Sequence, residues 1–485
     1  MTIENEPILS INLMERASLA MFKWISGKFE PGVTTLFAGA GNNGGDALAL
    51  ARMMALGGWD VTVYMITTDN LSPECKINYD RLTHLSKVKL KNLSDTQPQL
   101  SEGIVIDGLL GSGTNRPPEG NILKAIQIIN EGQCPVISID LPSGLRGENN
   151  ADVPRDAIVK ATYTLSLGFP KLAFLFPEND AFVGEWHVLN IGLNQQAIDQ
   201  SLTSWYYTSA PDAKPLLPSR DKFAHKGHYG HALLISGSYG MMGAAVLSSK
   251  ACLKAGVGLL TTHVPRYGYN IMQTAVPEAM VSIDRSDILF SEFPELEGYD
   301  AIGVGPGIGL KSNTVEALEQ LLNKITTQPL VIDADALNIL SQHPNLIDKL
   351  PKNAVLTPHP KEFRRLAGSW TNDYERLEKL IAFSTKHHVV VVLKGAYTTI
   401  ATPSGTCYFN STGNPGMASA GSGDVLTGII LGLLSQKIPP AEAAILGVYL
   451  HGSAGDCYAN AESEESLTAN DIVENIGAAF KILKS

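Results

Sequence analysis

The sequence predicts an α/β protein of two domains, each built on a parallel sheet. Short apolar runs alternate with helical stretches in both halves of the chain, which is the pattern of repeated β–α–β units. Between residues 204 and 223 this pattern gives way to proline and polar residues, as is typical of a domain junction. The length of 485 residues also requires more than one core, because single cores stop growing at roughly 250–300 residues. We therefore predict domains at 1–209 and 210–485.

The first domain begins with an amphipathic segment and continues with apolar runs that predict strands. Leu13, Ala17, Ala20, Met21 and Trp24 form one stripe of the opening segment, which predicts a helix with one buried face. Each later run is followed by glycine, aspartate, serine or proline, and ligands of open α/β sheets bind beyond the carboxyl ends of the strands. The expected strands span residues 34–39, 61–66, 103–108, 135–140 and 161–168.

The second domain repeats this alternation and then ends in helices. Since no short-period repeat is visible, the pattern favours a second α/β sheet and not a solenoid. The expected strands span residues 231–237, 300–307, 329–337, 353–360, 388–395 and 398–403.

Composition and charge exclude several classes of function. A formal net charge of −11 repels polyanions and no basic stripe is present, so we expect no nucleic-acid partner. The five cysteines are widely spaced without a CxxC pair, which argues against disulfides and a structural zinc site. The start of the chain lacks the blocks of a signal peptide, and no run reaches the roughly 18 apolar residues of a membrane span. We expect a cytoplasmic protein that binds small molecules and no membrane.

Residues 37–54, FAGAGNNGGDALALARMM, carry the first candidate site. Gly39, Gly41 and Gly44 match the GxGxxG fingerprint of dinucleotide-binding turns, which is a weak signal by itself. The fingerprint does not require the two asparagines and the aspartate of NNGGD. Amides and a carboxylate placed among glycines can bind hydroxyls, amides or a cation, while Asp46 can also serve as the N-cap of the following helix. Both roles of Asp46 stay open.

Two later strand ends offer similar chemistry, in VIDGLLGSGTNRP at 105–117 and ISIDLPSGL at 137–145. A single aspartate at a strand end is more often a turn former, but three such loops favour a site. If the sheet brings the loops together, Asn43, Asp107 and Ser143 offer hard oxygen ligands for an alkali or alkaline-earth ion. Asp140 then remains free for proton transfer.

These motifs, with LGFPKLAFLFPENDAFVGEWHVLNIGL at 167–193, resemble over residues 5–200 the YjeF N-terminal domain, the NAD(P)H-hydrate epimerase family. The resemblance implies a Rossmann-like three-layer fold, potassium held by Asn43, Asp107 and Ser143, and a catalytic Asp140. Ala47 departs from the family, which usually has another glycine there. The residues implied to bind the hydrated dinucleotide are Asn42, Asn43, Gly44, Gly45, Asp46, Gly111, Ser112, Gly113, Thr114, Asn115, Arg116, Pro117 and Asp140.

The strongest signal in the chain is NSTGNPGMASAGSGDVLTGIILGLL at 410–434, a glycine-rich turn that leads through Asp424 into an apolar helix. A helix N-terminus presents unpaired amide donors and the positive end of a dipole, which suits a phosphate. A carboxylate there can take a proton from a hydroxyl as that hydroxyl attacks the terminal phosphoryl group. The alternative is an N-cap, but Gly421 and Gly423 allow a close backbone approach that a cap alone does not need.

This spacing resembles the GxGD signature of ribokinase-like kinases. With VGPGIG (304–309), VIDADAL (331–337), TPHPKEF (357–363) and VLKGAYT (392–398), it resembles over residues 212–482 the YjeF C-terminal domain, the ADP- or ATP-dependent NAD(P)H-hydrate dehydratase family. Lys361 stands where that family usually has glycine. The resemblance implies substrate contacts from Ala244, Gly307, His359 and Asp424. It implies nucleotide contacts from Lys394, Gly395, Ala396, Tyr397, Thr398, Gly413, Asn414, Pro415, Gly416, Met417, Ala418, Ser419, Ala420, Gly421, Ser422 and Gly423.

Together the two resemblances imply a bifunctional metabolite-repair enzyme. The first domain would interconvert the R and S hydrates NADHX and NADPHX, and the second would dehydrate the S form to NAD(P)H. Asp424 would deprotonate the substrate hydroxyl, and ADP would donate its terminal phosphate, leaving AMP. Elimination of phosphate would then restore the reduced ring. We also expect Mg²⁺ in the second domain and assembly into a homo-oligomer.

Three other interpretations stay open. The GxGD turn alone would fit a small-molecule kinase with an appended ligand-binding module. The GxGxxG turn would fit a nicotinamide-dependent dehydrogenase, for which Asp69 is the one acidic candidate for the ribose contact. The first domain could also be a catalytically silent module that binds a partner.

Overall fold

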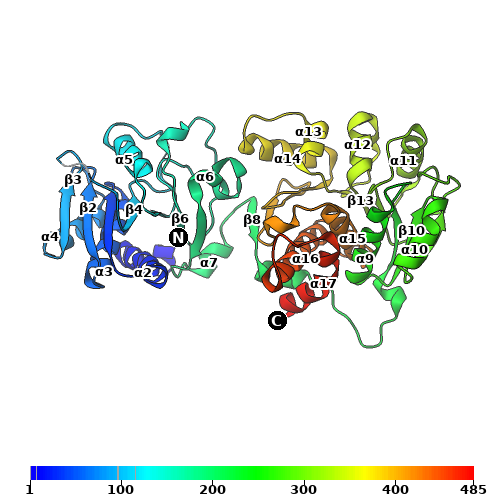
Figure 1. Ribbon diagram of the computed structural model, residues 1–485, viewed down its shortest axis with the longest axis horizontal. Coiled ribbons are helices and arrows are strands. Elements are labelled where there is room, and N and C mark those ends of the chain that lie inside the picture. Colours follow the sequence, from blue (N-terminus) through cyan, green and yellow to red (C-terminus); the bar gives the residue numbers. More distant parts are fainter. Residues whose placement is uncertain (1, 7, 96–97, 115) are drawn as a thin grey trace. The chain divides into compact units, whose positions relative to one another are not determined.

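The computed structural model describes residues 2–6, 8–95, 98–114 and 116–485. The chain forms two compact units that divide between Leu202 and Thr203, apart from residues 372–374, which group with the first. Figure 1 shows that each unit is an α/β body with a sheet and helices packed on it. The expected α/β class is thereby confirmed.

The first unit contains a seven-stranded sheet in the order β3-β2-β1-β4-β5-β6-β7, with all neighbours parallel. Its strands are β1 (Val33–Ala38), β2 (Asp60–Met65), β3 (Val88–Asn92), β4 (Ile104–Gly108), β5 (Val136–Ile139), β6 (Tyr163–Leu167) and β7 (Glu185–Leu189). Its helices are α1 (Thr2–Asn5), α2 (Ser10–Lys28), α3 (Asn42–Leu56), α4 (Pro73–Thr83), α5 (Gly120–Glu131), α6 (Asp180–Val183) and α7 (Gln195–Asp199).

Both faces of this sheet are covered, which explains why its central strands are apolar throughout. In β1, Leu36 and Ala38 pack with α2 and α3 on one face, whereas Phe37 packs with α5 on the other. The predicted opening helix is α2, and the predicted strands correspond to β1, β2, β4, β5 and β6. Sequence analysis missed the edge strands β3 and β7, because each is largely exposed and carries polar residues.

The second unit contains a ten-stranded sheet in the order β11-β10-β9-β12-β13-β14-β15-β16-β17-β8. Its strands are β8 (Trp205–Thr208), β9 (His231–Ile235), β10 (Leu259–Val264), β11 (Met280–Ile283), β12 (Ala301–Val304), β13 (Leu330–Ile332), β14 (Val355–Leu356), β15 (Val390–Leu393), β16 (Thr399–Ala401) and β17 (Cys407–Asn410). Its helices are α8 (Ala210–Ala213), α9 (Met242–Lys254), α10 (Tyr269–Ala275), α11 (Ser312–Lys324), α12 (Ala334–Gln342), α13 (Pro360–Ala367), α14 (Asp373–His387), α15 (Ser422–Ser435), α16 (Pro440–Ala461) and α17 (Ala469–Lys484).

Helix α15 is the central helix of the second unit and packs closely against α9. A Cβ atom added to Gly428 would lie 2.2 Å from the carbonyl oxygen of Ser248, and one added to Gly432 would lie 2.7 Å from that of Cys252. These two glycines therefore let the backbones of α9 and α15 touch, which fixes where α15 begins at the sheet edge. Among the residues that the structure describes, every helix is too short or too polar to cross a bilayer.

Strand β8 pairs in parallel with β17 and so belongs to the second sheet. The boundary that we predict before residue 210 falls after this strand. The prolines that marked the junction lie in α8 and in the turns that follow it. The sequence pattern did not reveal β8, because a short, partly exposed edge strand beside such turns looks like part of a linker.

The contribution of β8 can be measured on fragments. A fragment that starts at Thr203 should unfold at a higher temperature than one that starts at Ala210, because the shorter fragment loses the β8–β17 ladder and the stacked Tyr206 and Tyr408 rings, 5.3 Å apart. Each lost kcal/mol should lower the midpoint by roughly 2–4 °C. Equal midpoints in calorimetry would show that β8 adds nothing to the stability of this unit.

Candidate functional site

The first candidate site lies where the strand order of the first sheet reverses. Strand β1 is flanked by β2 on one side and β4 on the other, so the connections that follow β1 and β4 leave in opposite directions. Ligands of such sheets bind in the crevice at this switch point. Because β4 and β5 are also neighbours, Asn43 at the start of α3, Asp107 near the end of β4 and Asp140 just after β5 share one edge of the sheet.

The GNNGGD turn is helical earlier than its sequence suggested. Helix α3 begins at Asn42 with Gly41 in the extended N-cap position. Asp46 therefore lies in the second turn of α3, and the expectation that it caps the helix is wrong. A Cβ atom at Gly44 would lie 1.9 Å from the carbonyl oxygen of Gly39. The glycine lets the first turn of α3 fold back onto the end of β1, which moves the helix start upstream of the aspartate.

Asp107 is completely buried and accepts hydrogen bonds on both carboxylate oxygens. The donors are the Leu109 amide (3.2 Å), the Ser138 hydroxyl (2.8 Å), and the Ser143 amide (2.8 Å) and hydroxyl (2.5 Å). Burial raises the pKa of Asp107, while these hydrogen bonds act in the opposite direction. A cation placed against this carboxylate would remove the remaining penalty of burying its charge.

Asn43 and Ser143 reach the same loop as Asp107. The Asn43 side-chain amide donates to the Leu110 carbonyl (2.8 Å), and the Leu110 amide donates to the Ser143 hydroxyl (2.9 Å). The structure thus brings together the amide, carboxylate and hydroxyl that the sequence proposed as cation ligands. With its nitrogen used by Leu110, Asn43 keeps its side-chain oxygen for a ligand, so the set consists of hard oxygen donors.

Asp140 is not free, as the sequence had suggested, but is paired with a lysine that sequence reasoning missed. Lys171 donates to the Asp140 carboxylate (2.8 Å) and approaches the Ser166 hydroxyl (3.3 Å). The Leu167 amide donates to the same carboxylate oxygen (3.1 Å). Asp140 adopts φ = +64°, a left-handed conformation that aspartate tolerates better than most residues. Lys171 lies in the segment GFPKL at 168–172, part of the family motif given above. Nothing in the sequence linked it to Asp140, which lies 31 residues earlier in the chain.

Asp46 adds a second carboxylate near Asp140. Its side chain is almost completely buried, and burial together with the negative charge of Asp140 raises the pKa of Asp46 well above its usual value. The neighbouring Cys75 thiol is affected in the same direction, because burial and Asp46 raise its pKa to about 11. The raised pKa of Asp46 favours its protonated form, so the site offers a proton donor near the Asp140 carboxylate.

The remaining predicted contacts of the first site lie in the loop after β4. Gly111 lies against Asn43, where an added Cβ would be 3.3 Å from the Asn43 Cβ, and the Thr114 hydroxyl donates to the Gly111 carbonyl (3.2 Å). Ser112, Gly113 and Arg116 are exposed, and Pro117 is half-buried. Asn115 lies outside the described residues.

The second candidate site occupies the matching position in the second sheet. The strand order reverses between β9 and β12, and parallel neighbours continue from β12 through β13 and β14 to β15. The segments that follow these strands carry Gly307, Asp333, His359 and Lys394 in turn. The first two turns of α15 join them, because Gly423 lies against Lys394 and the Thr427 hydroxyl donates to Asp333.

Asp424 lies in the first turn of α15, beside a buried aspartate–lysine pair. The Lys394 ammonium is 2.9 Å from Asp333, whose second oxygen accepts from the Thr427 hydroxyl (2.8 Å). Asp424 is not an N-cap, because α15 begins at Ser422 and Gly421 holds the cap position at φ = +88°. Burial, opposed by Lys394 and aided by Asp333, raises the pKa of Asp424 to about 6. A carboxylate with that pKa suits proton abstraction near neutral pH.

The predicted substrate contacts of the second site meet at this edge in two groups. Gly307 adopts φ = +66°, and an added Cβ would lie 3.3 Å from the Ala244 Cβ and 3.0 Å from the Met241 carbonyl. His359 caps α13 by accepting from the Lys361 and Glu362 amides through Nδ1, so the neutral ring carries its hydrogen on Nε2. Burial and then Lys394 lower the pKa of His359, which keeps the ring neutral.

The predicted nucleotide contacts form two turns in the second unit. Lys394–Thr398 follows β15 and is closed by the Thr398 hydroxyl, which donates to the Gly395 carbonyl (3.0 Å). The turn from Gly413 is held by Asp456, which accepts from the Gly413 amide and the Asn414 side chain (2.9 Å each). The Ser419 hydroxyl oxygen is buried and has no hydrogen-bond partner among the described residues. Buried polar atoms are almost always paired, so this hydroxyl is available to a ligand.

Four functional candidates of the second site were missed by sequence reasoning. Asp333 and Thr427 orient Lys394, and Glu362 completes the cap of α13 by accepting from the His359 amide (2.8 Å). His451 contacts the Ser422 carbonyl (2.9 Å), and burial lowers the pKa of His451 to about 4. Asp333 alone had a usable signal, because it ends an apolar run.

Neither departure from the family patterns disturbs the local structure. Ala47 is completely buried, and its methyl group packs against Gly108. A Cβ added to Gly108 would lie only 2.4 Å from that methyl group, so the absence of a side chain at Gly108 makes room for Ala47. Lys361 lies in the first turn of α13, a helical conformation that any residue adopts, and its side chain is exposed.

Comparison with known proteins decides the family. A family model described as NAD(P)H-hydrate dehydratase matches residues 232–477, and one described as YjeF-related protein N-terminus matches residues 10–173. The bifunctional NAD(P)H-hydrate repair enzyme Nnr of Moorella thermoacetica is 34% identical, with 96% of this chain and 92% of that protein covered. This chain belongs to the bifunctional NAD(P)H-hydrate repair family. The Escherichia coli member is 32% identical over 91% of this chain and 84% of its own length.

Solved structures support the same family for the second unit. The ADP/ATP-dependent NAD(P)H-hydrate dehydratase of Bacillus subtilis, crystallised with ATP and Mg²⁺, is 32% identical with a TM-score of 0.51. The match covers 57% of this repair-family chain and 98% of that protein. A ribokinase-like protein of Enterococcus faecalis is 29% identical with a TM-score of 0.53, and 59% of this chain and 99% of that protein are covered. The ribokinase-like fold of the second unit is thereby confirmed.

The close approach at Gly44 can be tested by adding one methyl group. The Gly44→Ala variant should lose about 1–3 kcal/mol of unfolding free energy, because its Cβ would collide with the Gly39 carbonyl. Gly41→Ala is the matched control, since nothing lies within 4 Å of a Cβ at that position. If chemical denaturation finds equal losses for the two variants, the packing of α3 on β1 described above is incorrect.

Proposed function

We propose that the first unit epimerises hydrated NADH and NADPH and that the second dehydrates the S epimer at the expense of ADP. The observation that carries this proposal is Asp424, a half-buried carboxylate with a raised pKa at a glycine-rich helix start, beside Lys394 and Asp333. Membership of the repair family supports both activities. The two units then act in sequence, since the first supplies the epimer that the second consumes.

Asp424 removes the proton that makes the substrate hydroxyl a nucleophile. Hydroxide is a poor leaving group at neutral pH, whereas phosphate is a good one. Asp424 takes the hydroxyl proton, the oxygen attacks the terminal phosphorus of ADP, and AMP leaves. The carbon–oxygen bond of the phosphorylated hydrate then breaks, the ring loses a proton from the adjacent carbon, and the products are NAD(P)H and inorganic phosphate.

The chain's other residues position the reactants and balance charge. The Lys394 ammonium and the amides at the start of α15 face the transferred phosphoryl group, which suits its negative charge. Asp333 and Thr427 hold the lysine in place. The Nε2 hydrogen of His359 and the backbone around Gly307 and Ala244 orient the hydrated ring. Ser419 contacts the nucleotide through its unpaired hydroxyl.

Mg²⁺ fits this site as a companion of the nucleotide. Among the described residues, no group of three or more His, Cys, Asp and Glu side chains is arranged to hold a metal ion. Mg²⁺ in phosphoryl-transfer sites is bound largely by phosphate oxygens and water, with one or two carboxylates, so such a cage is not required. Asp333 and Asp424 are the carboxylates within reach, and the ion would neutralise charge on the phosphates.

In the first unit, Asp140 moves the proton that allows epimerisation. The hydrated carbon bears a hydroxyl and is bonded to the ring nitrogen. Removal of the hydroxyl proton by Asp140 opens the carbon–nitrogen bond to an aldehyde, while a proton donor such as Asp46 protonates the nitrogen. Reclosure on the other face of the aldehyde gives the other epimer. Lys171 orients Asp140 through their 2.8 Å contact.

Potassium fits the oxygen ligands of Asn43, Asp107 and Ser143. A large monovalent cation would be bound by the Asn43 side-chain oxygen, the Asp107 carboxylate and the Ser143 hydroxyl. Its charge would offset that of buried Asp107 and attract the phosphates of the dinucleotide. The glycine-rich start of α3 and the loop from Gly111 to Pro117 would contact the rest of the substrate.

We further propose a cytoplasmic homo-oligomer. The cysteines Cys75, Cys134, Cys252, Cys407 and Cys457 are all free, as expected of a reducing compartment. Met280 and Ile283 are exposed on the edge strand β11, and exposed apolar side chains on a strand edge favour association with a second copy.

The coupled reaction tests both activities in one assay. Wild-type protein, given mixed NADHX epimers and ADP, should restore the NADH absorbance completely. Asp140→Asn should restore only the share present as the S epimer, because the R epimer can no longer be converted. Complete recovery by Asp140→Asn would contradict the role of that carboxylate, and a stable phosphorylated product would favour a kinase. Parallel assays with ADP and ATP would determine the phosphoryl donor.

The role of Asp424 predicts both a mutational and a pH effect. Asp424→Asn should reduce dehydration of the S epimer by roughly 10²–10⁴-fold and leave epimerisation unchanged. Because the carboxylate is the active form, the wild-type rate should fall about tenfold per pH unit below its pKa of about 6 and level off above it. A rate that stays constant from pH 7 to pH 5 would exclude Asp424 as the base.

A further inference from the structure

A cavity of about 390 Å³ lies in the second unit, next to the predicted substrate contacts but outside them. One of its residues, Gly243, immediately precedes Ala244, and the Met241 carbonyl lies 3.0 Å from a Cβ added to Gly307. The cavity therefore continues from the edge at which the hydrated ring is proposed to bind. It is lined by Tyr239, Gly240, Met242, Gly243, Pro265, Tyr267, Gly268 and Ile271.

Two tyrosines stand at the rim of this cavity. The rings of Tyr239 and Tyr267 are 5.5 Å apart and perpendicular, and the residues are 68% and 65% exposed. All lining residues are uncharged, and the floor is glycine and aliphatic side chains. Exposed aromatic rings over an apolar floor suit a flat, uncharged heterocycle that stacks on them.

One loop, residues 284–292, holds both rim tyrosines by their backbones. The Tyr239 amide donates to the Ile288 carbonyl (2.9 Å), and the Tyr267 amide donates to the Asp287 carbonyl (3.1 Å). The amide of Arg266, the residue before Tyr267, donates to the Ser286 carbonyl (3.0 Å). The loop thus ties together the two backbone segments that carry the rim tyrosines.

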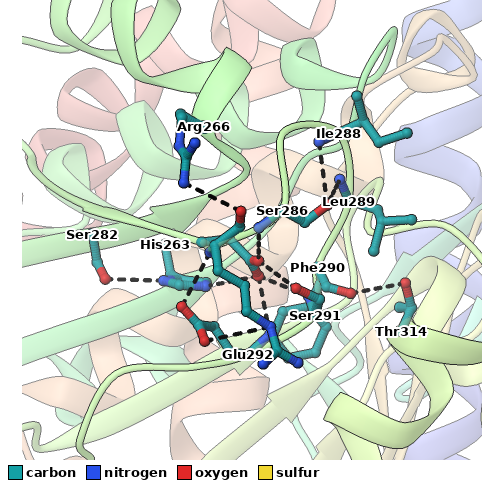
Figure 2. Close-up of polar contacts among 12 residues, drawn as sticks. His263, Arg266, Ser282, Ser286, Ile288, Leu289, Phe290, Ser291, Glu292 and Thr314 are labelled. Atoms are coloured by element: carbon teal, nitrogen blue, oxygen red, sulfur yellow. Dashed lines mark hydrogen bonds and ion pairs between the residues drawn. The ribbon is translucent and has the colours of Figure 1, made fainter.

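A buried carboxylate, that of Asp284, fixes this loop, whose residues Ser286, Ser291 and Glu292 are labelled in Figure 2. Asp284 accepts from the Ser286 amide (2.7 Å), the Ser291 amide (2.7 Å) and hydroxyl (2.6 Å), and the Glu292 amide (3.1 Å). The His263 ring approaches the same carboxylate at 3.3 Å. Burial opposes ionisation, but these hydrogen bonds outweigh it and lower the pKa of Asp284 to about 2. The loop is held by an ionised group that the proposed reaction does not use.

We propose that this cavity binds the adenine ring of the hydrated dinucleotide, packed against the edge-to-face pair of Tyr239 and Tyr267. This inference rests on the proposed dehydratase function. The reacting ring is a poorer occupant, because its hydroxyl must reach Asp424 and its carboxamide needs hydrogen-bond partners that the floor lacks. The adenine of ADP is a poorer occupant too, since the nucleotide turns follow β15 and β17, whereas the cavity borders β9 and β10 on the other side of the switch point.

The test compares tyrosine variants of the full-length protein. Tyr267→Leu and Tyr239→Leu should each raise the KM for S-NADHX about tenfold, since loss of a stacking ring weakens base binding by roughly that factor. The kcat and the KM for ADP should not change. Tyr269→Leu is the matched control, because Tyr269 is exposed on the adjacent α10 but does not line the cavity. Equal KM values in Tyr267→Leu and Tyr269→Leu would overturn the proposal.

A shortened substrate identifies which end of the dinucleotide occupies the cavity. With hydrated reduced nicotinamide mononucleotide, which has no adenine, Tyr267→Leu and wild type should have the same KM. A higher KM in Tyr267→Leu would mean that the reacting ring binds there, which overturns the proposal. A raised KM for ADP would overturn it in favour of the nucleotide's adenine.

Binding of NADH separates this inference from the proposed function. Calorimetric titration with NADH needs no turnover, and Tyr267→Leu should weaken binding at the second unit about tenfold, whereas Tyr269→Leu should bind as wild type does. If wild-type protein fails to dehydrate S-NADHX while this difference persists, the proposed function fails and the cavity remains a base-binding site. If dehydration proceeds but no titration difference is found, the cavity assignment fails alone.

Discussion

Both units depend on one steric constraint: a helix that begins at the carboxyl edge of the sheet packs against neighbouring backbone at a distance that only glycine allows. In the first unit Gly44 allows this, because its Cα faces the Gly39 carbonyl at a distance that excludes a side chain. In the second, Gly428 and Gly432 let α15 touch α9, and this packing sets where the GSGD turn meets the sheet. Helix amides, strand-end carboxylates and the switch point of strand order then occupy one small region.

This crowding separates the buried carboxylates into two chemical types. Asp107, Asp333 and Asp284 each accept several hydrogen bonds or an ammonium group, so they hold loops and side chains in place. Asp46 and Asp424 each lie near a second carboxylate, Asp140 and Asp333 respectively, which adds to the effect of burial and raises the pKa of both. A carboxylate with a raised pKa binds a proton more readily, which is the property a proton-transfer group needs. The same fold therefore supplies rigid supports and reactive groups with one residue type.

The paired design also explains why a fusion of these activities is chemically coherent. In the proposed scheme each unit would present an aspartate at the carboxyl edge of its sheet to the same dinucleotide, yet the surroundings differ. Asp140 is paired with Lys171, whereas Asp424 lies near Lys394 at the glycine-rich start of α15. The first arrangement favours reversible proton movement on the substrate, and the second favours phosphoryl transfer to it.

The sequence by itself determined the α/β class, the central strands and the motifs at their ends. Apolar runs buried on both faces and glycine–aspartate turns are local signals, and most predicted site residues do lie on the expected strand ends. Only the tertiary structure decided that α3 begins before Asp46, that Asp140 is paired with Lys171, that β8 joins the second sheet, and that Asp333 orients Lys394. These features depend on contacts between segments far apart in the chain. They also depend on close contacts between backbones, and a glycine in the sequence allows such a contact without showing which segment will make it.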